Sequence, residues 1–230
     1  MTFLISLILA ILLISIGRNF IKNHANLCYI IATLVSLTLI VFTYTNSMPN
    51  VPSWVNNYVL SIFTKSSFST AIFVVVMYTG ALKNGSKLIK FLMPIRAELS
   101  IIASILTLGH NIIYGKTYFV KLFTKPQSIA PNMLAAAIVS LILILIMIPL
   151  MITSFPKIRK KMKAKKWKQL QRLAYIFYGL IYVHLMLIMI PLARMNIIRY
   201  KFNVIIYTLI FLTYGAIRIR KALLRKKLSN

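Results

Sequence analysis

Long apolar stretches separated by short polar linkers dominate the chain. The apolar stretches cover residues 2–17, 27–46, 66–83, 97–116, 130–154, 171–192 and 203–218. A helix needs about 20 apolar residues to cross a hydrocarbon core of about 30 Å, and most of these stretches approach that length. The pattern predicts an all-α polytopic membrane helix bundle with about seven transmembrane helices. We expect residues 1–230 to form a single integral membrane domain.

Two segments near the N-terminus differ from the rest. Residues 2–17 form a short apolar run, as in a signal peptide, but Met1 is followed by no positively charged region and residues 10–20 contain no small-residue cleavage site. We therefore expect this run to be a membrane helix. Residues 54–64 (WVNNYVLSIFT) favour an interfacial helix, with Trp54 and Tyr58 in the headgroup layer.

The charge of the chain is strongly one-sided. It contains 28 Lys and Arg against a single acid, Glu98, for a net charge of +27, while 60% of its residues are hydrophobic. In a soluble protein this charge would indicate nucleic acid. Here the basic residues cluster between apolar runs, so we exclude nucleic acid and expect membrane lipids as partners.

The distribution of basic residues predicts the orientation. If the linkers after the first, third, fifth and seventh stretches are cytoplasmic, that side holds 21 basic residues and the opposite side seven. The positive-inside rule then places the N-terminus outside and the C-terminus in the cytoplasm. High Lys, Ile and Asn usage indicates the plasma membrane of a bacterium. The densest cluster, residues 157–172, is expected to lie against anionic lipid or to dock an acidic cytosolic partner.

Most catalytic chemistry is excluded by what the chain lacks. With one Glu and no Asp there is no carboxylate pair and no Ser-His-Asp set, so we predict no catalytic residue. The single Cys28 excludes an internal disulfide. Three histidines remain, and His24 lies in a polar linker where a solvated imidazole is expected.

His110 and His184 occupy matched positions. Each lies thirteen residues from the predicted cytoplasmic start of its stretch, or roughly 20 Å into the membrane at the helical rise. Polar groups within a membrane are costly and usually face a partner, a cavity or a cofactor. Two imidazoles at one depth suit bis-histidine ligation of a haem iron. The alternative is two separate histidines, each bonded to a carbonyl or hydroxyl group.

Other residues near this depth could assist a haem. Gly109 and Gly179 would let a flat macrocycle approach the backbone, although small residues also serve ordinary helix packing. Lys116, Arg194 and Arg199 are expected on the outer side, where they could meet the haem propionates.

Two stretches carry a family resemblance. RAELSIIASILTLGHNIIYG, residues 96–115, resembles the first haem-binding helix of the ferric reductase-like transmembrane family. RKKMKAKKWKQLQRLAYIFYGLIYVHL, residues 159–185, resembles the basic loop and following helix in the haem subunit of the periplasmic methionine sulfoxide reductase system. The resemblance covers residues 66–218. It implies a six-helix ferric reductase-like core with one additional N-terminal helix.

The resemblance also implies site residues and a cofactor. His110 and His184 match the axial haem ligands of the family. In two-haem members an inner pair lies about thirteen residues nearer the cytoplasm on the same helices, where this chain has Ala97 and Gln171. The resemblance therefore implies one haem b, near the outer leaflet, and no inner haem.

Three functions remain open. The first is a membrane cytochrome b that takes electrons from quinol or a separate flavin reductase and passes them to an extracytoplasmic acceptor protein. The second is a haem-binding protein that sequesters haem, or serves oxidative-stress defence, without turnover of its own. The third is a haem-free transporter, whose discontinuous helices would depend on Pro149 and Pro191.

Overall fold

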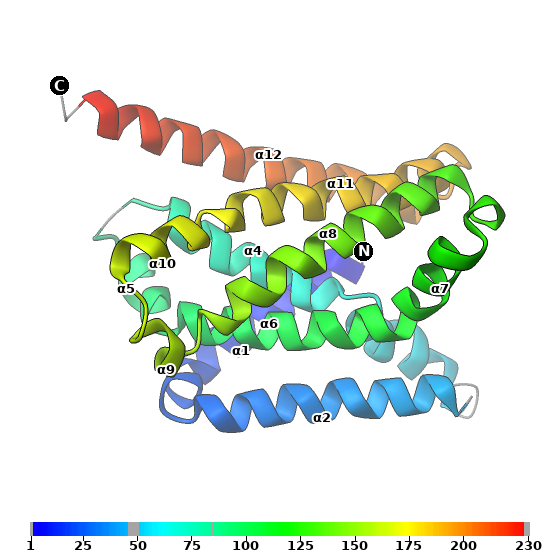
Figure 1. Cartoon of the computed structure of the whole chain (residues 1–230), viewed down its shortest axis with the longest axis horizontal. Helices are drawn as coiled ribbons and strands as arrows, with labels where there is room; N and C mark the ends of the chain where they lie inside the picture. Colours follow the sequence, from blue (N-terminus) through cyan, green and yellow to red (C-terminus); the bar gives the residue numbers. More distant parts are fainter. Residues whose placement is uncertain (1, 46–50, 84, 228–230) are drawn as a thin grey trace.

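The long helices of the protein lie side by side in one bundle (Figure 1). The computed structural model describes residues 2–45, 51–83 and 85–227, and this part of the chain contains no β-strand. Six of its helical segments are long and apolar enough to cross a membrane, and a bent pair makes a seventh. The long helices are α1 (Thr2–Asn23), α2 (Ala25–Tyr44), α4 (Ser67–Ala81), α6 (Arg96–His110), α8 (Pro131–Ile152), α11 (Leu173–Arg194) and α12 (Ile198–Lys227). The predicted all-α, multi-pass membrane bundle is confirmed.

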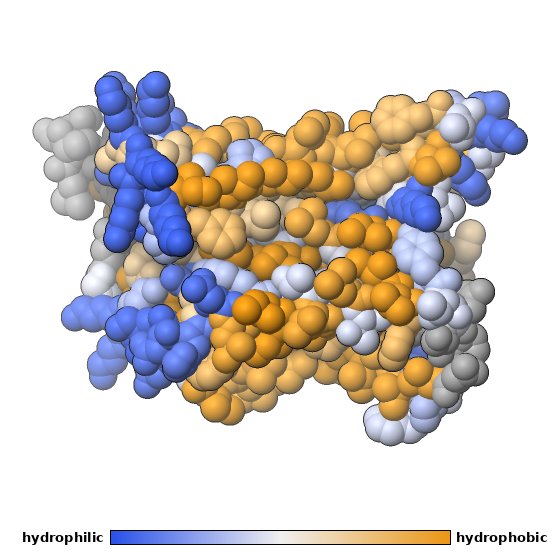
Figure 2. All heavy atoms as spheres, turned by 60° about the horizontal axis from the view of Figure 1, so that its bottom comes forward, coloured by the Kyte–Doolittle hydropathy of each residue, from blue (hydrophilic) through white to orange (hydrophobic). Residues whose placement is uncertain are grey.

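Short elements cover the two ends of the bundle. They are η2 (Val55–Leu60), α3 (Ser61–Thr64), α5 (Lys87–Leu92), η3 (Met93–Ile95), η4 (Asn111–Gly115), α7 (Lys116–Thr124), η5 (Pro126–Ser128), α9 (Pro156–Arg159) and α10 (Ala164–Gln171). We call the end with α5, α9 and α10 the basic end, and the end with α7 the far end (Figure 1). Hydrophilic atoms gather at both ends, with an apolar belt between them (Figure 2). Such a belt is typical of a bundle that crosses a bilayer.

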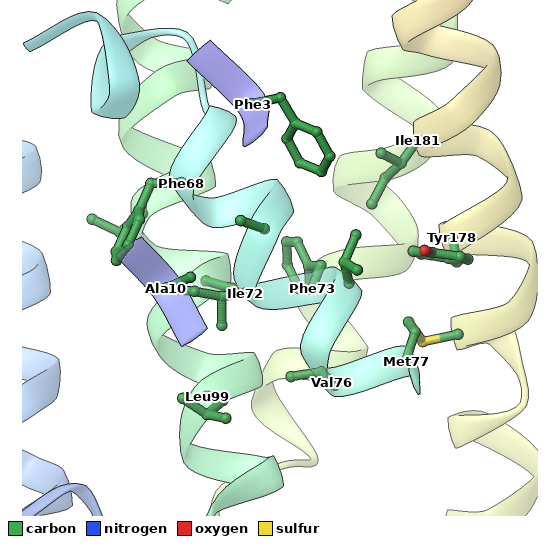
Figure 3. Packing of buried hydrophobic residues seen from close by; sticks show 14 of the residues in the cluster. Phe3, Ala10, Phe68, Ile72, Phe73, Val76, Met77, Leu99, Tyr178 and Ile181 are labelled. Atoms are coloured by element: carbon green, nitrogen blue, oxygen red, sulfur yellow. The ribbon is translucent and has the colours of Figure 1, made fainter. Parts of the chain in front are cut away.

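The N-terminal helix α1 is an integral part of the bundle. Its buried residues include Phe3 and Ala10, and the ring of Phe3 stacks on Tyr207 of α12 with the ring centroids 4.0 Å apart. Figure 3 shows Phe3 and Ala10 beside the buried side chains of α4. Removing α1 would therefore expose the central helix of the bundle.

Helix α1 also extends beyond the predicted boundary at residue 17. Arg18 lies within the helix, and its Nε donates a hydrogen bond of 2.8 Å to the carbonyl of Phe91. Its guanidinium lies over the ring of Phe91, 4.9 Å from the centroid. A basic residue that would end an isolated apolar stretch is thus held by a tertiary contact.

The segment predicted to be interfacial has two parts. Trp54 and Tyr58 are exposed, as expected in a headgroup layer. The last turn, α3, is largely buried, and η2 with α3 forms a pair with α4 that is bent by 47° at Lys65 and Ser66. Ser66 has a positive φ of 59°. The start of the segment is therefore exposed, as an interfacial helix requires, whereas its end packs into the bundle.

Helix α4 lies at the centre of the core. Nearly all of its residues are buried, and it packs against α1, α6 and α12. On one side, α6 also packs against α2, and on the other, α11 packs between α8 and α12. Side chains of α4, among them Phe73, face Tyr178 and Ile181 of α11 (Figure 3). This arrangement sets α6 and α11, the two helices with the matched histidines, around one central helix.

Candidate functional site

His110 and His184 line the same cavity, which has a volume of about 400 Å³. We call it the histidine cavity. Its wall comes from the bend before α4 and from α4, α6, η4, α7, α8, α11 and α12, and it includes Lys65, Phe73, Thr107, Tyr118, Ala136, Ser140, Met147, Phe177 and Tyr200. The volume lies within the range of about 300–1,000 Å³ that is usual for small-molecule sites. The structure thus brings together the two residues that matched depth singled out.

His110 is held by a carbonyl from another element. It is the last residue of α6, directly before the π-helical turn η4, and its Nδ1 donates to the carbonyl of Thr64 at 2.6 Å. A carbonyl can only accept, so the hydrogen is on Nδ1 and Nε2 carries a free lone pair. Thr64 ends α3, and carbonyls at a helix C-terminus lack their helical partner. The bend before α4 therefore supplies the acceptor.

His184 is held in the same tautomer. The hydroxyl of Ser140 donates to the carbonyl of Ala136 at 2.9 Å, so the Ser140 oxygen accepts from Nδ1–H of His184 at 3.2 Å. The Ala136 carbonyl accepts from the same Nδ1–H, also at 3.2 Å. Metal-ligating histidines are usually oriented in this way, with the second ring nitrogen bonded to a carbonyl or another acceptor.

This donor set fits a haem better than a bare metal ion. Among the described residues, no group of three or more His, Cys, Asp or Glu could hold a metal ion. Two neutral imidazoles with free Nε2 atoms suit an iron whose remaining ligands come from a macrocycle. The aromatic and aliphatic wall suits the apolar body of such a ligand.

Gly109 and Gly179, the two glycines considered for contact with a macrocycle, do not lie at the histidine cavity. Gly109 is buried and faces α2, where a Cβ would lie 2.9 Å from both Cβ and Oγ of Ser36. A Cβ at Gly179 would have no neighbour within 4 Å. Neither residue lines the histidine cavity, whereas Gly115 of η4 does. For Gly109, close helix packing is the correct interpretation.

The cation nearest the cavity is not one of the three suggested from sequence. The ammonium of Lys116 lies over the ring of Tyr44, 4.6 Å from its centroid, and neither Arg194 nor Arg199 lines the cavity. Among the described lining residues, Lys65 is the only Lys or Arg. Lys65 was counted among the seven basic residues of the outer side but was not connected with the histidines, because the bend that brings it to the cavity is a tertiary feature.

The third histidine stands apart from the cavity. His24 is exposed at the junction of α1 and α2, with its ring 5.1 Å from that of Phe20. A solvated linker histidine was the prediction, and the structure confirms it.

Ala97 and Gln171 line a second cavity, of about 510 Å³, nearer the basic end. Neither is an iron ligand here, since Ala97 has no donor atom and the Gln171 amide donates to Thr153 Oγ at 3.3 Å. We call this space the arginine cavity, because the basic residues in its wall are Arg96, Arg159, Lys168, Arg172 and Arg218. Three residues line both cavities and form a shared wall: Phe73, Met147 and Phe177.

Helices, apolar belt and central cavity together define a multi-pass membrane protein. Residues 79–182 match the family described as ferric reductase like transmembrane component. The match runs from the end of α4 into α11; it includes His110 and ends two residues before His184. Over residues 79–182 the chain is therefore similar to a ferric reductase-like transmembrane component, which agrees with the resemblance of residues 96–115 to that family.

A relative extends over almost the entire chain. A protein of Treponema pallidum (strain Nichols), described as uncharacterized, is 41% identical over 227 residues, which is 99% of this chain. The chain spans 62% of the length of that protein. No solved structure matches the chain significantly.

Proposed function

We propose that the protein is a membrane-bound b-type cytochrome with one haem in the histidine cavity and His110 and His184 as its axial ligands. It would take electrons from quinol or a separate flavin reductase and pass them to an extracytoplasmic acceptor. The observation that carries the proposal is the pair of imidazoles in one apolar cavity, each anchored through Nδ1. The family match supports membrane electron transfer as the general class.

The residues around the cavity have distinct parts in this proposal. The Thr64 carbonyl and the Ser140 hydroxyl fix the ring orientations and keep Nε2 unprotonated. Phe73 and Phe177, whose rings meet edge to face at 5.1 Å, exclude water on the side of the basic end. Lys65, which lines the cavity, would neutralise a haem carboxylate. The bound haem itself would supply one-electron chemistry at iron.

The proposed orientation follows the basic residues. With the basic end in the cytoplasm, the N-terminus lies outside, and the histidine cavity lies toward the outer leaflet. An acceptor would then dock at the far end, near α7.

Absorption spectra of the purified protein, oxidised and dithionite-reduced, test the haem site. We expect sharp low-spin b-type bands in the wild type and in His24→Ala, the matched control. Because each axial ligand is essential to bis-histidine ligation, His110→Ala and His184→Ala should each lower the haem content more than tenfold. A wild-type chain that stays free of haem after expression with ample haem would refute the proposal.

Haem storage or oxidative-stress defence is the second candidate. It is favoured by Ala97 and Gln171, because without ligands there the haem lies far from a donor at the basic end. The two candidates differ in turnover. A conduit oxidises reduced quinol or a reduced flavin reductase when an acceptor is present, whereas a store exchanges haem with apomyoglobin and sustains no turnover.

Transport without haem is the third candidate. The discontinuous helix that such a transporter would use is not one of the two predicted from proline. Helices α8 and α11 continue through Pro149 and Pro191, while the break lies at Lys65 and Ser66. That break already has a use, since it frees the Thr64 carbonyl for His110. Transport activity retained in the His110→Ala, His184→Ala double variant would favour this candidate.

A further inference from the structure

The arginine cavity holds a concentration of positive charge that no acid of this chain balances. It adjoins a smaller pocket of about 220 Å³, and Arg96 and Arg218 line both. The basic residues around the two spaces are Arg96, Arg159, Lys168, Arg172, Arg218 and Lys221. Glu98 is the only acid in the sequence, and it lines neither space. The counter-charge must therefore come from outside the chain.

Capping of α4 accounts for only part of this charge. Arg96 Nε donates to the Val76 carbonyl at 3.2 Å, while Arg218 and Lys221 donate to the Gly80 carbonyl at 3.1 and 3.2 Å. A helix C-terminus carries roughly half a negative charge. The charges of Arg96 and Arg218 alone exceed it several-fold, and their mutual repulsion grows where the surroundings are less polar than water. The excess favours a bound anion.

Arg218 and Arg159 are held in place before any ligand arrives. Arg218 donates to the hydroxyl of Tyr175 as well as to α4. Trp167 donates from Nε1 to the Thr153 carbonyl at 3.1 Å, and the guanidinium of Arg159 lies over its ring, 4.5 Å from the centroid. Guanidinium groups fixed in this way bind planar or tetrahedral oxyanions at a small entropic cost.

We propose that the arginine cavity binds the phosphate group of a mono- or diester. Phosphate suits it better than a carboxylate because a phosphate monoester carries about −1.5 to −2 charges and accepts bidentate bonds from arginine. The apolar part of the wall, which includes Met77, Phe73 and Phe177, takes the organic portion of the ligand. The proposal does not rest on haem binding in the neighbouring cavity. The ester is either the headgroup of an anionic lipid or a soluble phosphate ester.

Native mass spectrometry of the whole chain in a neutral detergent tests the proposal with two probes. One probe is phosphatidylglycerol, with phosphatidylcholine as the neutral comparison, and the other is glycerol 3-phosphate. We expect the wild type to retain one molecule of one probe. Retention of phosphatidylglycerol identifies a lipid site, and retention of glycerol 3-phosphate identifies a site for soluble esters.

The variants locate the bound molecule. Arg218→Gln and Arg220→Gln remove the same charge from the same helix, but Arg220 is exposed and lines neither space. Arg218→Gln should weaken binding at least tenfold, because a hydrogen bond to a charged group contributes about 1.5–3 kcal/mol, while Arg220→Gln should bind as the wild type does. Arg172→Gln, which lies outside the α4 cap, should weaken binding several-fold in a fully folded protein. Failure of the wild type to retain either probe, or equal losses in all three variants, would overturn the proposal.

Discussion

The histidine cavity and the arginine cavity lie between the same helices, yet one is lined by neutral imidazoles and the other by positively charged side chains. Both are lined by residues of α4, α6, α8 and α11, and they share the wall formed by Phe73, Met147 and Phe177. The first presents two neutral imidazoles to an apolar space, whereas the second presents several guanidinium groups. One bundle therefore offers two chemically different sites, one above the other.

The difference depends on few residues. On α6, thirteen residues separate Ala97 from His110, and the same distance along the chain separates Gln171 from His184. Each histidine has a fixed acceptor for Nδ1, while Gln171 bonds to Thr153 instead. The helices supply the spacing, and the residues at these positions decide what is bound.

The largest effect is expected from introducing two histidines into the arginine cavity, which would make it resemble the histidine cavity. The Ala97→His, Gln171→His double variant should bind a second haem, because its cavity of about 510 Å³ is at least as large as the histidine cavity. The pyridine haemochrome assay should then give two haems per chain instead of one. Ala97→His alone is the control and should stay at one. A ratio of one in the double variant would mean that the missing Nδ1 acceptors, or the arginines, exclude haem.

The helices could be predicted from the sequence because their signal is local. Each of the seven apolar stretches corresponds to a long helix, since an uninterrupted apolar run in a membrane has to satisfy its backbone internally. Matched spacing likewise found His110 and His184, because helical rise converts residue number into depth.

Tertiary contacts explain what the sequence did not reveal. The acceptors Thr64 and Ser140 belong to α3 and α8, so no spacing along α6 or α11 indicates them. The direction of Lys116 toward Tyr44 depends on where α2 packs. The burial of α3 depends on the bend at Ser66, which an apolar count does not detect.

Gly109 tests how closely α6, the helix that carries His110, packs against α2. Gly109→Ala should lower the free energy of unfolding by about 1–3 kcal/mol, because the new Cβ would lie 2.9 Å from Cβ and Oγ of Ser36 in a tight core. Thermal unfolding in detergent measures the loss. Gly179→Ala, with no neighbour within 4 Å, is the control and should be at least as stable as the wild type, because Ala favours the helix by up to about 1 kcal/mol.

The clash of Gly109→Ala can also be removed by shortening Ser36 on α2. The Ser36 hydroxyl is buried and has no hydrogen-bond partner among the described atoms, so its deletion costs no hydrogen bond. Adding Ser36→Gly to Gly109→Ala should restore most of the lost stability. A double variant as unstable as Gly109→Ala would show that the glycine is required for another reason.

Ser140 tests whether the Nδ1 anchors distinguish the two cavities. Ser140→Ala removes one of the two acceptors for His184, and the Ala136 carbonyl remains. Loss of such a partner typically costs 10–100-fold in metal affinity, so we expect roughly a tenfold faster loss of haem to apomyoglobin. Ser100→Ala, in the wall of the arginine cavity, is the matched control and should leave haem loss unchanged.

The smallest effect is expected at Ser66, where the bent span turns toward the histidine cavity. Its φ of 59° is a strained conformation for a residue with a Cβ, and Gly adopts it freely, so Ser66→Gly relieves about 1 kcal/mol. The same change removes the hydroxyl contact with Ser69, whose own oxygen accepts from Thr107 at 3.0 Å, at a cost of about 1 kcal/mol. The two terms should nearly cancel, leaving the melting temperature and the haem spectrum close to those of the wild type. Ser66→Val has the strain without the hydroxyl and should be the less stable of the two. If Ser66→Gly instead lost haem, the hydroxyl chain from Ser66 to Thr107, and not the bend alone, would be what holds the Thr64 carbonyl against His110.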